Sequence, residues 1–339
     1  MSNNDSNIVQ TVPVSETVRE PGPNVIAWAN NLSKTFGEQK AVNNLSFEVP
    51  RGAILGLIGP SGCGKTTTIR LLTGIYKPTS GEARVLGRTP SHFSTRDRER
   101  IGYLTQGFVL YPDLTVRENM DFAASLYGVS LRRGKRINNL LDFVELGEHK
   151  NKLARQLSGG MQRRLSLAAT LIHKPELLFL DEPTAGIDPV LRLKIWDYFK
   201  ELQADDYTML ITTQYVGESA YCDYVGIMVA GRLLMVDTPE GMRRRAYGGD
   251  VVNLRTVQPI PVGERNRLEQ YDFVVAPIVL VNAREVRLVV DEADTALPPL
   301  MDWARNNNLQ IESIGEYQPP FDDVFVKLVR QEGVEIQDA

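Results

Sequence analysis

The stretch Gly59-Pro60-Ser61-Gly62-Cys63-Gly64-Lys65-Thr66 decides the fold of this chain. It has the pattern G-x-x-x-x-G-K-[ST], follows an apolar run at residues 53–58 and precedes a helix-like segment that starts at Thr67. Glycines let backbone N–H groups turn toward an anion, and the helix N-terminus adds the positive end of its dipole. Lys65 can reach the terminal phosphates of a nucleotide, and Thr66 offers a hydroxyl to Mg²⁺. A glycine-rich turn alone could be structural, but the strand and helix on either side predict a phosphate-binding loop.

The composition is that of an ordinary soluble protein. The chain has 339 residues, of which 42% are hydrophobic and 24% charged, and its net charge is −4. This length suggests two domains, or one large domain with an appendage. The acidic balance provides no general basic field, so no nucleic-acid partner is expected. The two cysteines, Cys63 and Cys222, are far apart in sequence, which argues for a reducing cytosol and against a disulfide framework.

No part of the sequence predicts a membrane span or a signal peptide. No stretch reaches the roughly 18 consecutive apolar residues that a span needs. The first residues are neither basic nor apolar, as a signal peptide would be. Residues 1–24 are polar with three prolines and are predicted to be a disordered tail. Any role at a membrane must therefore depend on a partner.

The remaining chain divides into two predicted domains. Residues 25–247 alternate short apolar runs with helical patterns, which predicts an α/β domain, and the phosphate-binding loop within it is typical of a P-loop NTPase. Within it, residues 107–157 lack strand-like runs and are predicted to form a helical subdomain. Residues 248–339 show a β-α-β-β-α-β order, which predicts a small ferredoxin-like α+β domain with an accessory or regulatory role. One of its helices is expected over residues 297–307, with Pro298 and Pro299 in the first turn.

Two acidic residues follow a buried strand downstream of the loop. Asp181 ends the apolar run 176–181, at the edge where ligands approach an α/β sheet. Its carboxylate can hold Mg²⁺ beside Thr66. Glu182 follows and is available to orient or deprotonate water that attacks a γ-phosphate. The alternative is an acidic strand end that caps the next helix.

A second glycine-containing segment, residues 157–162, precedes another helix. Ser158 and the amides that follow it can bind an anion at the helix N-terminus. Considered alone, the segment is more simply a capped helix. Two anion sites in one domain are explained most simply by a nucleotide held between two copies of the domain.

The segments GPSGCGKTT, LSGGMQ and LLFLDEPTAGID, in this order, resemble the ATP-binding subunit of an ABC transporter. The resemblance covers about Val25 to Asp237. It implies that Phe36 stacks on adenine, that Gln106 touches Mg²⁺ and water and links to the membrane subunit, and that residues 185–188 cross to the partner's site. The nucleotide-binding residues implied by the loop and the resemblance are Phe36, Gly59, Pro60, Ser61, Gly62, Cys63, Gly64, Lys65, Thr66, Thr67, Ser158, Gly159, Gly160, Gln162 and Asp188. The catalytic set is Lys65, Gln106, Glu182 and Gln214, and the metal set is Thr66, Gln106 and Asp181.

Residues 111–119 and 321–325 are similar to segments of drug-resistance and ABC-2-type exporters. These resemblances imply an ATP-binding and hydrolysing subunit that drives separate membrane subunits, with ATP and Mg²⁺ as cofactors. They also imply a homodimer or heterodimer of ATP-binding subunits, bound to integral membrane permeases on the cytoplasmic side of the cell membrane. An exporter is the expected type of transporter.

One position departs from the family pattern. After the strand-like residues 209–213 the family usually places a histidine that contacts the γ-phosphate, and this chain has Gln214. A glutamine amide can donate a hydrogen bond but carries no charge. Losing one charge-assisted bond costs on the order of 1–3 kcal/mol, or roughly tenfold to a hundredfold in rate. We therefore predict slowed hydrolysis and an active site.

Two other functions remain open at this point. A soluble ABC ATPase that acts on ribosomes or DNA usually has two such domains or long coiled-coil insertions, and here only about ninety residues separate Lys65 from Ser158. A regulatory partner with weak hydrolysis is suggested by Gln214 alone. For Cys63, a helix N-terminus can lower a thiol pKa, which predicts alkylation that ATP blocks; the alternative is a small packing residue.

Overall fold

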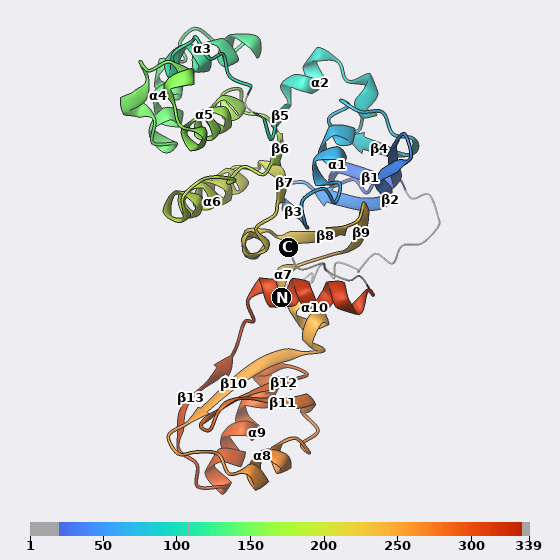
Figure 1. Cartoon of the computed structure of the whole chain (residues 1–339), viewed down its shortest axis with the longest axis vertical. Helices are drawn as coiled ribbons and strands as arrows, with labels where there is room; N and C mark the ends of the chain where they lie inside the picture. The colour runs from blue at the N-terminus through green and yellow to red at the C-terminus, as the bar shows by residue number, and fades with distance from the viewer. Residues whose placement is uncertain (1–19, 108, 334–339) are drawn as a thin grey trace, which may run out of the picture. The chain divides into compact units, whose positions relative to one another are not determined.

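The computed structural model describes residues 20–107 and 109–333, which form two compact units (Figure 1). The first unit ends at Val236 and the second begins at Asp237. The sequence predicts the boundary later, between residues 247 and 248. The structure differs because α7 (Pro239–Tyr247) packs against α10 (Phe321–Gln331) within the second unit. The predicted tail, residues 1–24, lies mostly outside the described residues.

A six-stranded sheet forms the centre of the first unit, in the order β5-β6-β7-β3-β8-β9. Neighbouring strands from β5 to β8 are parallel. The apolar runs that predict strands covered on both faces form β3 and β6, which are buried at every residue. The strands are β3 (Ile54–Ile58), β5 (Ile101–Leu104), β6 (Leu177–Asp181), β7 (Thr208–Thr213), β8 (Tyr224–Val229) and β9 (Arg232–Asp237).

A three-stranded antiparallel sheet, in the order β2-β1-β4, adjoins the central sheet. Its strands are β1 (Val25–Phe36), β2 (Gln39–Pro50) and β4 (Ser80–Val85). In β2, Leu45, Phe47 and Val49 are buried, and they share one hydrophobic core with side chains of α1 (Lys65–Leu72). Beyond this core lie α6 (Pro189–Ala204), α2 (Thr95–Glu99), and the 3₁₀ turns η1 (Pro90–His92) and η4 (Val216–Tyr221).

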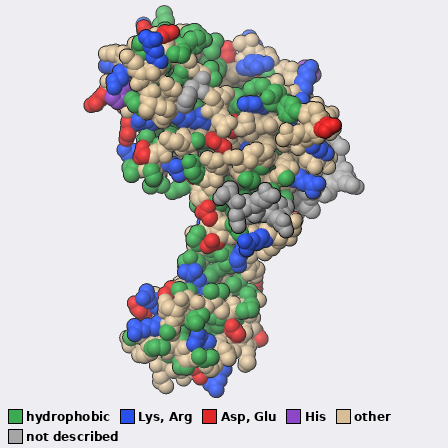
Figure 2. Space-filling view, in the orientation of Figure 1, with side chains coloured by type: hydrophobic (Ala, Val, Ile, Leu, Met, Phe, Trp, Pro, Cys, Tyr) green, Lys and Arg blue, Asp and Glu red, His purple; other side chains and the backbone are tan. Residues whose placement is uncertain are grey.

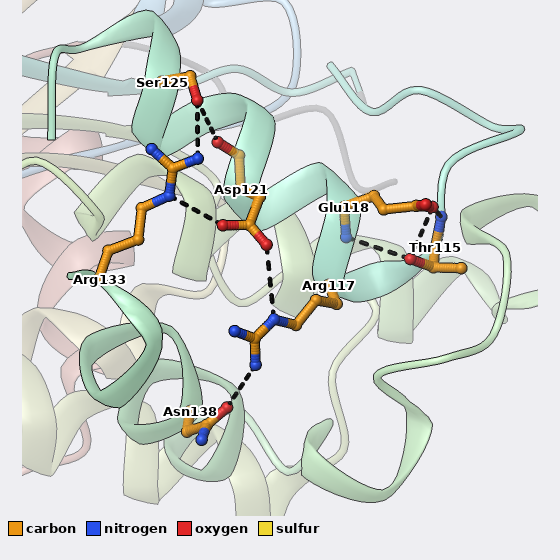
Figure 3. Close-up of polar contacts among 7 residues, drawn as sticks. All are labelled: Thr115, Arg117, Glu118, Asp121, Ser125, Arg133 and Asn138. Carbon is orange, nitrogen blue, oxygen red and sulfur yellow. Dashed lines mark hydrogen bonds and ion pairs between the residues drawn. The ribbon is translucent and has the colours of Figure 1, made fainter. Parts of the chain in front are cut away.

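The predicted helical segment contains α3 (Val116–Leu126), α4 (Gly134–Phe143), and the turns η2 (Gly147–His149) and η3 (Ala154–Gln156). The helix α5 (Gly159–Leu171) follows and packs against α3 and α4. Thr115 and Glu118 form a capping box that starts α3. Asp121 pairs within α3 with Arg117 at 3.5 Å, and it also pairs at 2.8 Å with Arg133, the residue before α4, so the Arg133 contact holds α3 to the start of α4 (Figure 3). Across the described ranges, every helix is too short or too polar to cross a bilayer.

The second unit contains a four-stranded antiparallel sheet in the order β11-β12-β10-β13. This strand order is that of the predicted ferredoxin-like arrangement. Leu268, Leu300 and Trp303 of the helices share a hydrophobic core with residues of β10 and β12. The elements are β10 (Asp250–Thr256), α8 (Val262–Leu268), β11 (Val274–Asn282), β12 (Glu285–Val290), α9 (Ala293–Asn306) and β13 (Ile311–Glu316).

The start of α9 corrects one expectation. The sequence places Pro298 and Pro299 in the first turn of a helix that begins near residue 297, but α9 begins at Ala293 and both prolines lie inside it. The Ala293 amide donates to Asp250 Oδ2 at 3.0 Å, so a contact from a distant strand fixes the first turn. A contact of this kind is invisible to local sequence patterns.

Candidate nucleotide-binding site

The loop from Gly59 to Gly64 connects β3 to α1, as the sequence predicts. Gly59 has φ 155° and Gly64 has φ 107°, a region that side chains other than glycine rarely adopt. A Cβ atom at Gly59 would lie 2.0 Å from the Met228 carbonyl oxygen, and one at Gly64 would lie 2.4 Å from that of Ala41. Both positions therefore require glycine for conformation and for space.

A pocket of about 480 Å³ opens beside this loop. It brings together residues from five separate parts of the chain, including Phe36, Gln106 and Glu182, which the sequence assigns to one site without showing that they meet. Gly59, Pro60 and Cys63 are absent from the residues that line it. The lining residues are Phe36, Gln39, Ala41, Ser61, Gly62, Gly64, Lys65, Thr66, Thr67, Arg70, Tyr76, Gln106 and Glu182.

Lys65 lies inside the loop, with its side chain almost fully buried. Its Nζ donates to the carbonyl oxygens of Gly59 at 2.6 Å and Pro60 at 3.0 Å. These bonds hold a positive charge at the base of the pocket, where the helix α1 N-terminus also points. The arrangement favours an anion with several oxygens, such as a polyphosphate.

Asp181 and Thr66 meet where β6 ends, and their donor set fits Mg²⁺. Asp181 is completely buried, and its Oδ1 accepts from Thr66 Oγ1 at 3.0 Å and Thr212 Oγ1 at 2.6 Å. Its Oδ2 is buried and has no hydrogen-bond partner, so one carboxylate oxygen remains for a cation. The described residues contain no cluster of three His, Cys, Asp or Glu side chains that could hold a metal alone. A magnesium ion here would therefore need phosphate oxygens and water as well.

Glu182 lines the pocket from an unusual backbone conformation, with φ 52°. Its N–H donates to the Thr212 carbonyl oxygen at 3.0 Å. A residue other than glycine in this region costs free energy and persists only when its surroundings hold it. With this backbone conformation Glu182 is one of the residues that line the pocket beside the loop, where a carboxylate can orient or deprotonate water.

Aromatic side chains form one end of the pocket. Phe36, which is 41% exposed, has its ring centroid 5.2 Å from that of Tyr76 in an edge-to-face arrangement. Arg70 donates to the Tyr76 hydroxyl at 3.1 Å, and Lys34 Nζ lies 5.0 Å from the Phe36 centroid. The sequence identifies Phe36 but provides no signal for Tyr76 or Arg70. An exposed ring on a charged pocket suits stacking on a nucleobase.

Gln214 follows β7 and lies against the phosphate-binding loop. Its Oε1 accepts a hydrogen bond from Ser61 Oγ at 3.1 Å. None of His92, His149 or His173 lines the pocket. The amide nitrogen of Gln214 has no hydrogen-bond acceptor among the described contacts, so it remains available as a donor.

The segment after Leu157 lies outside this pocket. Ser158 caps α5 by accepting from the Met161 amide at 3.3 Å, and a Cβ atom on Gly160 would lie 3.1 Å from the Gly186 carbonyl oxygen. Gln162 is predicted to bind nucleotide, but its side chain donates to Ala154 O at 3.1 Å and so is engaged within its own chain. The predicted ligands Ser158, Gly159, Gly160 and Gln162 are all absent from the pocket lining.

Asp188 has a local structural role in this chain. It is the N-cap of α6, and its Oδ1 accepts from the Leu191 amide at 3.0 Å. It is likewise absent from the pocket lining. The capping role considered for the acidic residues near this strand end therefore belongs to Asp188 and not to Glu182.

Cys63 corrects the expectation of a reactive thiol. The side chain is 4% exposed and belongs to the hydrophobic core. Burial raises the pKa of Cys63, and the neighbouring Lys65 opposes this only in part. The helix N-terminus does not make this thiol reactive because the side chain points into the core, away from the pocket. Cys63 is therefore a small packing residue, which is the alternative considered from the sequence.

Arg163 is a site residue that the sequence does not reveal. It lies on α5, is 3% exposed, and donates to the backbone carbonyl oxygens of Gln106 and Glu182. Two arginines follow the glycine-containing segment, and no local pattern distinguishes the buried one from Arg164. Thr212 is missed for a similar reason, because a threonine in a buried strand carries no distinctive signal.

A family model described as ABC transporter matches residues 42–185. The chain is 33% identical to the daunorubicin resistance ATP-binding protein DrrA3 of Streptomyces coeruleorubidus over 301 residues. This alignment covers 88% of this chain and 94% of DrrA3. The chain belongs to the ABC transporter ATP-binding proteins. It is also 37% identical to the probable multidrug ABC transporter ATP-binding protein YbhF of Escherichia coli (strain K12), over 72% of this chain. The chain spans only 41% of the length of YbhF.

Solved structures of ABC ATP-binding proteins have the same fold. One ATP-binding subunit of an ABC transporter matches with a TM-score of 0.61 and 28% identity, over 66% of this chain and 93% of that structure. The dimeric cassette MJ0796, in a post-hydrolysis state with ADP and Pi, matches with a TM-score of 0.59 and 26% identity, over 62% of this chain and 98% of that structure. The predicted family, ABC ATPase fold and nucleotide-binding class are confirmed.

Proposed function

We propose that this ABC protein is the ATP-hydrolysing subunit of an exporter. One observation carries the proposal: the pocket unites the phosphate loop, Gln106, Glu182 and the ring of Phe36, with Asp181 beneath it. Relatives named for drug resistance and for Nod factor export support export as the direction. A purely regulatory role has less support, because the chain retains Lys65, Asp181 and Glu182 and brings them together around the phosphate-binding loop.

The residues divide the work on MgATP between them. Phe36 stacks on adenine, and the loop amides with Lys65 bind the phosphates. Thr66, Asp181 and Gln106 hold Mg²⁺, which when bound neutralises charge on the phosphate oxygens. Glu182 orients or deprotonates the attacking water, and Gln214 donates its amide to the γ-phosphate.

A second copy of the domain completes each site. The α5 N-terminus, capped by Ser158, carries amides suited to phosphate and lies outside the pocket of its own chain. In a dimer these amides face the nucleotide of the partner subunit, as does the loop that ends at Asp188. The dimeric structure of MJ0796 supports this arrangement.

A membrane permease subunit docks on the helical segment of the first unit. Large apolar side chains are exposed there, at Val109, Tyr111, Phe122, Leu126 and Leu131. The rings of Tyr111 and Phe122 lie 4.5 Å apart, so they present one apolar surface. Hydrophobic side chains on the face of the first unit are visible in Figure 2. Exposed apolar patches of this kind mark protein partners, which supports a docking site for a permease subunit, with the chain bound on the cytoplasmic side of the membrane as part of the proposal. The second unit is an accessory domain of the same subunit.

The test combines hydrolysis with dimerisation in the variant Glu182→Gln. The wild-type chain should hydrolyse MgATP. The variant lacks the base, so its rate of hydrolysis should be at least about a hundredfold lower. The variant should also accumulate as an ATP-bound dimer in size-exclusion chromatography with light scattering. Wild-type hydrolysis that survives in Glu182→Gln, or a variant that stays monomeric with MgATP, would contradict the proposal.

A further inference from the structure

Arg163 forms an unusual set of contacts beside the nucleotide pocket. Its Nη1 donates to the carbonyl oxygens of Thr105 and Gln106, the latter at 3.2 Å. Its Nη2 donates to those of Asp181 and Glu182, the latter at 2.6 Å. Each terminal N–H group of the guanidinium thus has one backbone carbonyl as its acceptor.

These carbonyls lie where two neighbouring strands end. β5 and β6 are parallel partners, and Leu104 pairs with Leu180, so the chain leaves β5 after Leu104 and β6 after Asp181 at the same edge of the sheet. Arg163 reaches them from α5, the helix whose N-terminus carries Ser158 and the following glycines. One side chain therefore joins α5 to both segments that supply polar groups to the pocket.

The contacts are to backbone oxygens and include no direct carboxylate pair. Burial lowers the pKa of Arg163, and the nearby charges of Asp181 and Glu182 oppose that change. A guanidinium keeps its proton in proteins, so a charged group is buried here with carbonyl dipoles as its partners. Such a group is costly unless its hydrogen bonds are maintained, which makes the geometry of both loops dependent on Arg163.

The dependence is strongest at Glu182. Its N–H is held by the Thr212 carbonyl and its own carbonyl by Arg163, so both sides of a residue with φ 52° are fixed. Releasing one side lets the backbone relax toward a more common conformation. The carboxylate would then leave its place beside the loop.

We propose that Arg163 is a positioning residue that sets the orientation of Glu182 and Gln106 in the site of its own chain. The inference rests on the proposed ATPase function and states which of the two nucleotide sites Arg163 serves. The amides at the N-terminus of α5 serve the partner's nucleotide, whereas Arg163, on the same helix, acts on the nucleotide bound by its own chain.

The test compares Arg163→Lys with Arg164→Lys in the full-length chain. Lysine keeps the charge but offers its three N–H donors from one point, so it cannot span the two loops. Arg164 is a matched control: it is the next residue of α5 and donates to the Val144 carbonyl at 3.0 Å, away from the pocket. Measurements are kcat, MgATP affinity, the unfolding midpoint and amide hydrogen exchange at residues 105–107 and 182–184.

For Arg163→Lys we expect kcat to fall about tenfold to a hundredfold, because a small misplacement of a reacting group has effects of this size. MgATP affinity should stay within about twofold, since the phosphate loop is untouched. Exchange should accelerate at residues 105–107 and 182–184, while Arg164→Lys leaves all these values near those of the wild type. Equal kcat in the two variants, loss of affinity in proportion to kcat, or unchanged exchange would each overturn the inference.

Mixed dimers that combine Arg163→Lys with Glu182→Gln show whether Arg163 affects the nucleotide site of its own chain or that of the partner subunit. When Arg163→Lys and Glu182→Gln are on the same chain, the other chain keeps a complete site, and about half of the wild-type rate should remain. When they are on opposite chains, both sites should fail. The reverse result would show that Arg163 acts through the partner's nucleotide and would refute the inference. Absence of hydrolysis in the wild-type dimer would count against the proposed function, while the exchange measurement would still test Arg163.

Discussion

The strongest test of the altered γ-phosphate contact is the substitution Gln214→His. Gln214 Oε1 already accepts from Ser61 Oγ at 3.1 Å, so its amide N–H is the group left to meet a phosphate oxygen. A bond between an uncharged donor and a charged acceptor contributes about 1.5–3 kcal/mol, and charging both partners strengthens a bond further. We expect histidine to add about 1–2 kcal/mol of transition-state stabilisation, or roughly a five- to thirtyfold gain in kcat.

The assay is steady-state ATP hydrolysis between pH 5.5 and 8.5 for both proteins. The unperturbed pKa of histidine is about 6.5, so the gain should be present below that pH and shrink as the imidazolium loses its proton. The wild-type chain has an uncharged amide at this position, so its rate should not show this fall around about pH 6.5. Gln214→Ala is the control and should be slower than the wild type at every pH. A Gln214→His rate equal to the wild type at pH 6, or a gain that is constant with pH, would refute the reasoning.

Three further predictions follow from the geometry. Gly59→Ala should lower the free energy of unfolding by at least about 2 kcal/mol in urea titrations, because its Cβ would lie 2.0 Å from the Met228 carbonyl oxygen; an unchanged midpoint would contradict this. Cys63 and Cys222 are both buried, so a thiol reagent should modify neither in the native chain, with or without MgATP, and rapid labelling would show that the loop opens. Burial lowers the pKa of His173, so the unfolded chain binds the proton more readily and stability should fall as the pH drops through about 6.5. In His173→Gln this acid-dependent loss, measured as the change in unfolding midpoint between pH 7.5 and 5.5, should be smaller.

The elements that could be predicted are those whose signal is local. Continuous apolar runs identify β3 and β6 because both faces of these strands are covered, and the intervening glycines locate the phosphate loop. The helical segment is also predictable, since the lack of strand-like runs in residues 107–157 is a local property of the sequence; the structure adds the capping box of Thr115 and Glu118 that starts α3. The family resemblance adds Phe36 and Gln106, which no physical pattern identifies alone.

The elements that could not be predicted depend on which strands become neighbours. Thr212 reaches Asp181 because β6 and β7 are adjacent, and Arg163 reaches two loops because β5 lies beside β6. Neither pairing can be derived from the residues themselves. Cys63 is misjudged for a related reason: the helix N-terminus is visible in the sequence, but the inward direction of the side chain is not.

The helix α5 carries two groups with proposed roles in ATP hydrolysis, the amides at its N-terminus and the side chain of Arg163. Ser158 and the glycines begin it, and Arg163 lies five residues later, about 7.5 Å along the axis at the usual rise. Over this length a helix moves as a rigid body, so a shift of its N-terminus on meeting the partner's phosphate must also shift the guanidinium. The guanidinium in turn donates to the carbonyl oxygens of Gln106, a proposed metal ligand, and of Glu182, the proposed base for the attacking water. If the roles proposed for α5 and Arg163 hold, binding of nucleotide by one chain is linked to the alignment of the Glu182 carboxylate in the other. If Gln214 contacts the γ-phosphate as proposed, hydrolysis should depend more on that alignment than it would with histidine at this position, because the glutamine amide carries no charge.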